Sequence, residues 1–174
     1  MVADAAGLAK ELHTQVKVLE EFDLYGLRPC TGDGCTGGEQ GTRRHMKHFR
    51  IATVAEQSAE FRRVLWTGEH SQLVIMTVPP GGEIGEEVHE GIDQILSFVS
   101  GTGEARIAGQ TEKVQQGDLV VVPAGTNHNF VNTGPNPLVL YTVYSPPEHA
   151  DGVVHRTKEE ADAAEESGED EPPG

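Results

Sequence analysis

The stretch GDLVVVPAGTNHNFVN, residues 117–132, combines an apolar run, a turn and a polar residue that opens a second apolar run. Pro123 and Gly125 interrupt the branched aliphatic residues, because proline lacks a backbone N–H and both residue types favour turns. His128 then begins the next apolar segment. The pattern predicts two short strands joined by a tight connection, with a histidine at the start of the second.

The remainder of the segment from Met46 to Pro147 repeats this pattern. Short apolar runs such as QILSFVS and LVLYTVYS alternate with turn signals such as PPGG, SGTG and NTGPNP. Many short strands at spacings of about 8–12 residues indicate a sandwich or a closed barrel. We therefore predict an all-β domain, and we interpret HFRIAT and FRRVLW as its first two strands.

Polar side chains border several of the predicted strands. Glu87 and His89 are two residues apart, so on a strand they share one face. Gln94 shares its face with apolar neighbours in its own run and is expected to point inward, as is His128. A buried polar group is costly unless it is satisfied. A metal ion shared by these four side chains would satisfy all of them, and we predict such a site.

These segments resemble the two motifs of the cupin superfamily. The first motif runs Gly, five residues, His-x-His, three or four residues, Glu, six residues, Gly. In this chain its positions are occupied by Gly81, Glu87, His89, Gln94 and Gly101. The second motif runs Gly, five residues, Pro-x-Gly, two residues, His, three residues, Asn. It is matched at every position, by Gly117, Pro123, Gly125, His128 and Asn132.

The resemblance covers about three-fifths of the chain and implies a single jelly-roll β-barrel over residues 46–148. Residues 1–45 are then an N-terminal extension, helical at first and followed by a Gly-rich loop that holds Cys30 and Cys35. Residues 149–174 are expected to form a short helix and a disordered acidic tail. FRRVLWTGEHSQLVIM, EIGEEVHEGIDQ and PPEHADGVVH look like small microbial type-2 cupins, loosely labelled mannose-6-phosphate isomerase-like, whose members begin near Met46. This resemblance leads us to expect that residues 1–45 are an accessory extension or a start-site artefact.

Two of the implied metal ligands depart from the family pattern. Glu87 stands in place of a histidine, and Gln94 in place of the glutamate, so one carboxylate is retained. Asp93 is an alternative carboxylate, but strand parity turns it outward, which favours Gln94. The resulting set of two histidines, one carboxylate and one amide suits a single divalent ion such as Zn, Mn, Fe or Ni.

The resemblance and the predicted site together imply a metal-dependent enzyme that acts on a sugar, sugar acid or keto-enol compound by isomerase or lyase chemistry. The general acid or base would be Glu86, Tyr141, Tyr144 or His149. Each of them also has an ordinary interpretation, as a surface acid, as packing in the barrel wall, or as part of a surface tail. Two alternatives remain open: a ligand-binding or sensor module with a structural metal, and a metal-dependent dioxygenase, which favours two histidines and a carboxylate.

Charge restricts the partners. A formal net charge of −15 argues against nucleic acid and against anionic membrane surfaces, both of which recruit lysine and arginine. Arg106 and Lys113 are the only lysine or arginine residues between Val64 and His155, which disfavours a phosphosugar. The absence of a signal-peptide pattern predicts a cytoplasmic protein. The family resemblance further implies a homodimer that pairs through HFRIAT or FRRVLW and binds a small molecule.

Overall fold

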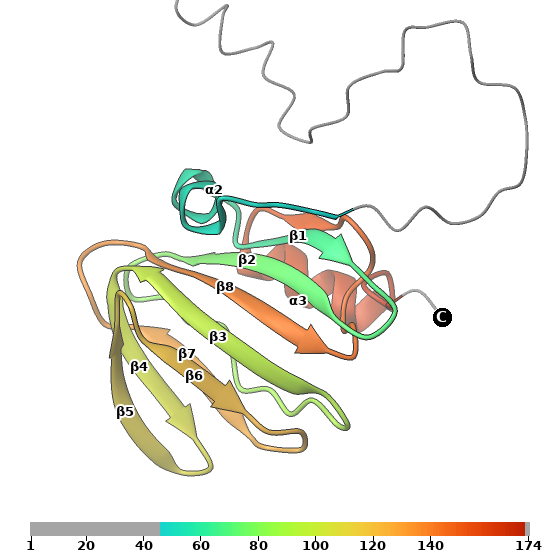
Figure 1. The fold of residues 1–174 in the computed structure, drawn as a ribbon. Coiled ribbons are helices and arrows are strands. Elements are labelled where there is room, and N and C mark those ends of the chain that lie inside the picture. Colours follow the sequence, from blue (N-terminus) through green and yellow to red (C-terminus); the bar gives the residue numbers. More distant parts are fainter. Residues whose placement is uncertain (1–45, 173–174) are drawn as a thin grey trace, which may run out of the picture. The chain divides into compact units, whose positions relative to one another are not determined.

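The computed structural model describes residues 46–172, which form two facing antiparallel β-sheets (Figure 1). The six-stranded sheet has the order β6 (Leu119–Val122), β3 (Asp93–Ser100), β8 (Leu138–Ser145), β2 (Gln72–Val78), β1 (Arg62–Thr67) and β9 (Val154–His155). The three-stranded sheet has the order β5 (Gln110–Gln115), β4 (Thr102–Ile107) and β7 (His128–Asn132). The all-β, jelly-roll fold predicted from the sequence is confirmed. The predicted N-terminal extension and its two cysteines lie outside the described residues.

The alternation of buried and exposed side chains along the strands builds the core between the two sheets. In β8, Leu138, Leu140 and Tyr144 point inward and are almost completely buried. Phe98 of β3 meets Phe130 of β7 across the interior, with ring centroids 5.8 Å apart. Every second side chain is buried because only one face of each sheet packs against the core.

The prediction that HFRIAT forms a strand is wrong, because this segment enters the helix α2 (Ile51–Gln57). Ile51, Val54 and Ala55 recur at helical spacing and pack against the outer face of the six-stranded sheet. Figure 1 shows α2 lying over this face. An apolar stripe at a spacing of three and four residues outweighed the β-branched composition on which the prediction rested.

The strand β1, which contains most of FRRVLW, is not an edge strand. It pairs with β2 on one side and with β9 on the other, through Arg62↔His155 and Arg63↔Val154. β9 thus covers only the first two residues of this edge of β1, and HFRIAT is not a strand. The oligomeric state itself stays a prediction.

The C-terminal segment packs against the barrel. Helix α3 (Lys158–Ser167) is capped by Thr157, whose hydroxyl accepts from the backbone N–H of Glu160, and ends at Gly168 with φ 73°. Ala161 on α3 is fully buried in the core cluster. Beyond the helix, Asp170 is buried and accepts a hydrogen bond from the N–H of Ala150 at 3.0 Å. Asp170 lies in the segment predicted to be a disordered acidic tail, and its buried partners are ones that no sequence pattern reveals. Within residues 46–172, no helix has both the length and the hydrophobicity that a bilayer crossing requires.

Candidate metal centre

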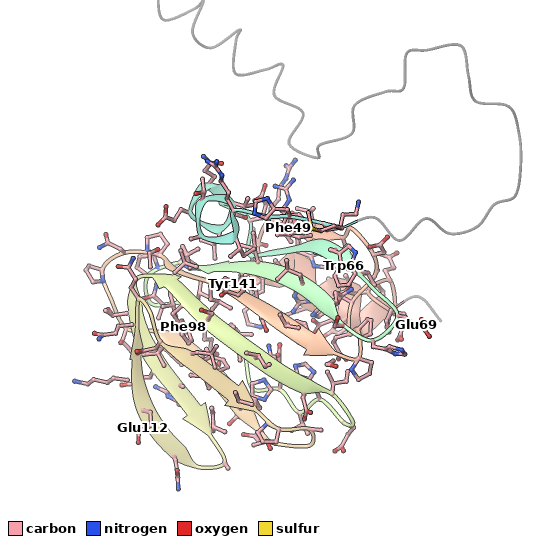
Figure 2. All side chains as sticks on the ribbon, in the orientation of Figure 1. Phe49, Trp66, Glu69, Phe98, Glu112 and Tyr141 are labelled. Atoms are coloured by element: carbon pink, nitrogen blue, oxygen red, sulfur yellow. The ribbon has the colours of Figure 1, made fainter. Side chains whose placement is uncertain are left out.

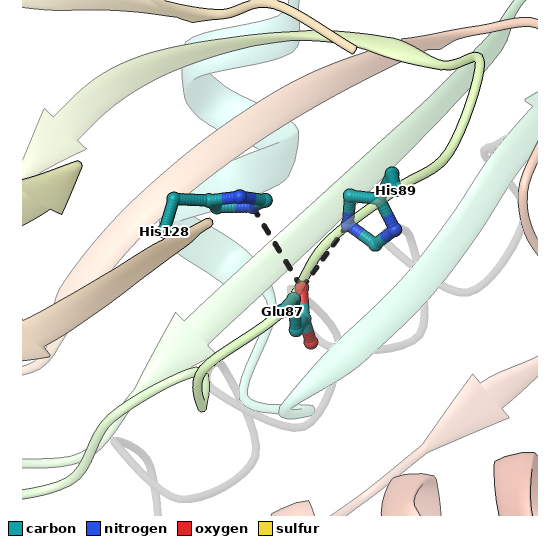
Figure 3. Close-up of side chains that lie close together, drawn as sticks. All are labelled: Glu87, His89 and His128. Carbon is teal, nitrogen blue, oxygen red and sulfur yellow. Dashed lines mark ion pairs between the residues drawn. The ribbon is translucent and has the colours of Figure 1, made fainter. Parts of the chain in front are cut away.

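Glu87, His89 and His128 converge inside one end of the barrel (Figure 3). An isolated β-bridge joins Glu87 to His128, with both backbone N–H groups donating to the partner's carbonyl at 2.9 and 3.0 Å. His89 follows Glu87 by two residues and so lies on the same side of the chain. One ligand atom from each side chain lies within 4.8 Å of the other two, which is close enough for all three to bind one ion.

The orientations of the two imidazole rings suit metal binding. His89 Nδ1 lies 3.1 Å from Glu148 Oε1, and His128 Nδ1 lies 2.9 Å from the carbonyl oxygen of Thr126. Both partners are acceptors, so each Nδ1 donates and each Nε2 is directed toward the cluster. Neither Nε2 has a hydrogen-bond partner among the described residues, although both are buried. Glu87 Oε2 lies 3.2 Å from His89 Nε2 and 4.0 Å from His128 Nε2. Two imidazole nitrogens that face one carboxylate, and no other polar group among the described residues, fit a bound cation.

Gln94 is buried as predicted, with 1% of its surface exposed, at the start of β3. Its neighbours across the sheet are Val122 and Tyr144. Both of its amide atoms are buried without a partner among residues 46–172. Asp93 instead faces outward, where its carboxylate accepts from the N–H of Ala124 at 3.0 Å. The burial of Gln94 leaves it available as a fourth ligand, a role that stays a prediction.

Burial and neighbouring charges shift the pKa values of the three side chains in the cluster. Burial disfavours the charged imidazolium of His89, but its hydrogen bond with Glu148 and the nearby Glu87 carboxylate raise its pKa to about 9. Burial lowers the pKa of His128. Burial alone would raise the pKa of Glu87, yet His89 and Arg62 outweigh it and hold this pKa below its usual value. Without a metal ion, the site at neutral pH therefore holds a protonated His89 between two carboxylates.

This charge state predicts a pH dependence for metal binding. A metal ion must displace the proton of His89, so below the pKa of about 9 we expect the apparent affinity to rise by about tenfold per pH unit. Calorimetric titration with zinc between about pH 6.5 and 8, in buffers of different ionisation enthalpy, measures the released protons. We expect about one proton per ion. Release of no proton at neutral pH would contradict the assigned state of His89.

The four predicted acid–base candidates separate into two groups. Tyr144 is buried with its ring edge-on to His89 at 5.5 Å, and burial raises its pKa, so the phenol stays protonated. His149 is also buried and stands edge-on to Tyr144 at 5.0 Å. Tyr141 packs with α2 on the opposite face of the sheet, and Glu86 is exposed, one position out of phase with Glu87. Both side chains therefore lie apart from Tyr144 and His149, and their role as acid–base groups stays a prediction.

A cavity of about 500 Å³ opens beside Glu87 and His89. Its other wall comes from the C-terminal segment, and the acidic side chains there were not anticipated as site residues. Beneath this wall, Arg62 is buried and donates to Glu165 at 2.6 Å and to Asp170 at 2.9 Å. Strand alternation could have identified Arg62, which shares the inward face of β1 with Val64. No sequence signal connects residues that lie about a hundred positions apart.

Comparisons with known proteins agree with this architecture. The Cupin_2 family model, described as a cupin domain, matches residues 74–144. The uncharacterized protein YrkC of Bacillus subtilis is 41% identical over 122 residues, which span 67% of this chain and 66% of YrkC. The crystal structure of BH2720 from Bacillus halodurans superposes with a TM-score of 0.67 at 38% identity, covering 72% of this chain and 98% of that one. The oxalate-binding protein of Thermotoga maritima is 31% identical over 68 residues, 39% of this chain and 56% of that protein. With its jelly-roll fold and these matches, the chain belongs to the cupin superfamily.

Proposed function

We propose that this protein is a metal-dependent cupin enzyme in which Glu87, His89 and His128 hold one divalent ion and Gln94 is a weaker fourth ligand. The observation that carries the proposal is the convergence of three ligand atoms within 4.8 Å of one another, with His128 Nε2 buried without a partner and His89 Nε2 facing only the Glu87 carboxylate among the described residues. Glu148 and the Thr126 carbonyl fix the rings through Nδ1. Such supporting partners are typical of protein metal sites.

The cavity beside this cluster supports catalysis on a small, oxygen-rich substrate over a purely structural metal. A bound divalent ion would supply Lewis-acid stabilisation of an enolate or alkoxide oxygen. Two side chains near the cavity can move protons. Tyr144 stays protonated and can donate, whereas His149, whose Nδ1 lies 3.0 Å from Asp170 Oδ2, has an Nε2 without a hydrogen-bond partner among residues 46–172. Proton transfer next to a carbonyl is the basis of isomerase and lyase chemistry.

Similarity to an oxalate-binding protein supports a small, oxygen-bearing ligand in general terms. A second candidate function is a metal-dependent dioxygenase. It is favoured by one specific observation, the grouping of one carboxylate with two histidines, which is the ligand set of non-haem iron oxygenases. The identity of the bound metal separates the two candidates.

Elemental analysis of the protein purified without chelator or nickel resin is the primary test. We expect about one divalent ion per chain, and turnover in a screen of hexoses, sugar acids and diketones that is lost in His149→Ala. Zinc or manganese supports the isomerase or lyase proposal, and iron with oxygen consumption supports the dioxygenase. Metal with no turnover of any compound would favour a binding module. A chain that takes up no divalent ion would overturn the metalloenzyme proposal.

A further inference from the structure

The wall of the cavity opposite the candidate metal centre is built from the C-terminal segment. Glu87, Val88, His89 and Ile92 line one side, and Glu165 of α3 together with residues 170–172 lines the other, with residues 147–149 between them. The segment after β8 therefore forms one wall of the cavity beside the cluster.

This cavity is strongly acidic. Among the residues that line it are five carboxylates, Glu87, Glu148, Glu165, Asp170 and Glu171, but no lysine or arginine. The guanidinium of Arg62 lies beneath the wall, where Nη1 pairs with Glu165 and Asp170 and Nη2 lies 4.0 Å from Glu87. Its charge is thus already balanced by the protein. Even with a divalent ion bound, the five carboxylates exceed the positive charges of the ion and of Arg62 by two.

A second feature of the cavity indicates what kind of ligand would be accepted. His149 lines the cavity, is 3% exposed, and its Nε2 is buried without a partner among residues 46–172. Its Nδ1 lies 3.0 Å from Asp170 Oδ2 and 3.5 Å from Arg62 Nη1, so Nε2 is the ring nitrogen that these residues leave without a partner. The carboxylates of the cavity accept hydrogen bonds, so a ligand that contacts them must bring donors, such as hydroxyl or ammonium groups.

We infer that, among the proposed substrates, the cavity selects neutral or cationic ligands that carry hydroxyl or amino groups, such as sugars or amino sugars, and repels anions, including sugar acids, dicarboxylates and phosphosugars. This inference rests on the proposed function, because it concerns access to the metal. It separates this chain from its oxalate-binding relative, whose ligand is a dianion. The acidic C-terminal wall is the specificity determinant.

Removal of the metal by two planar aromatic chelators of different charge tests the inference. The full chain is first loaded with zinc, and its zinc content is measured. Stripping rates are then compared for neutral phenanthroline and dianionic dipicolinate, in the wild type and in Glu171→Lys. Glu171 is exposed and lines the cavity, so this substitution reverses one charge of the wall without touching a buried group. Glu112→Lys, on β5 at the far end of the molecule, makes the same change in net charge away from the cavity (Figure 2).

We expect Glu171→Lys to accelerate stripping by dipicolinate about five- to tenfold at low salt, because the reversal acts on a doubly charged ligand at short range. The phenanthroline rate should change less than about twofold, Glu112→Lys should match the wild type, and about 0.5 M salt should shrink the difference. Equal acceleration of both chelators, or none of dipicolinate, would overturn the inference while leaving the metal site intact. Failure to take up zinc would instead overturn the proposed function and the inference with it.

Discussion

His128→Ala is expected to remove most of the bound metal, with a loss of affinity of at least about 100-fold. Residues that merely support a ligand typically contribute 10- to 100-fold, and His128 supplies one of only two nitrogen donors in the cluster. Its side chain is almost completely buried, so solvent offers no replacement ligand at the same place. Competition for zinc against a chromogenic chelator measures the affinity directly.

Two further substitutions serve as controls, one with no expected effect on metal affinity and one with a smaller effect than His128→Ala. His70→Ala removes a histidine whose side chain is 85% exposed, and metal affinity should stay unchanged. Gln94→Ala should weaken binding less than His128→Ala, because an amide oxygen is a neutral, weaker donor than an imidazole nitrogen. Full zinc occupancy in folded His128→Ala would show that the ligand assignment is wrong.

Arg62→Met is expected to lower the free energy of unfolding by about 3–5 kcal/mol, the usual cost of leaving one partner of a buried ion pair without its counter-charge. The Arg62 side chain is 2% exposed and that of Asp170 is 0% exposed, with 2.9 Å between nitrogen and oxygen. Burial would raise the pKa of Asp170, but hydrogen bonds from His149 and Ala150 and the charge of Arg62 lower it, so its carboxylate is ionised. Urea denaturation of the metal-free protein measures the change.

The adjacent arginine provides the matched control. Arg63 is 35% exposed and forms only a 3.6 Å ion pair with Glu60, so Arg63→Met should cost less than about 1 kcal/mol. Adding Asp170→Asn to Arg62→Met should recover part of the lost stability, because the unpaired buried charge is then removed. A cost for Arg62→Met no larger than that for Arg63→Met would contradict the buried role of this ion pair.

Local features of the sequence determined the barrel and the residues that converge in it. Period-two alternation, Gly and Pro turn signals and the motif from Gly117 to Asn132 predicted the all-β fold. The spacing of Glu87 and His89 placed both on one face, and the parity of Gln94 predicted its burial. Each of these inferences depends on backbone geometry over a few residues, which the sequence encodes directly.

Where the prediction failed, longer-range packing was the cause. Ile51 lies in a helix because its apolar face packs against the outer face of the sheet. Tyr141 packs with that helix and does not face the cavity. Glu86 precedes Glu87 by one residue, so its side chain points to the other side of the chain from the cluster. The β-bridge between Glu87 and His128 determines which of the two glutamates points inward. A hydrophobic period of two or of 3.6 residues indicates that one face of a strand or helix is buried, but it does not identify the element that packs against that face.

The sequence by itself therefore determined an all-β domain, because alternation and turn chemistry act locally, and its resemblance to the cupin motifs indicated the side chains that meet within it. Only the tertiary structure decided that the acidic C-terminal segment is a wall of the cavity and that Arg62 pairs with Asp170, 108 positions away in the chain. Opposite charges attract through space and leave no periodic trace along the chain. Contacts of this kind become visible only when the chain is folded.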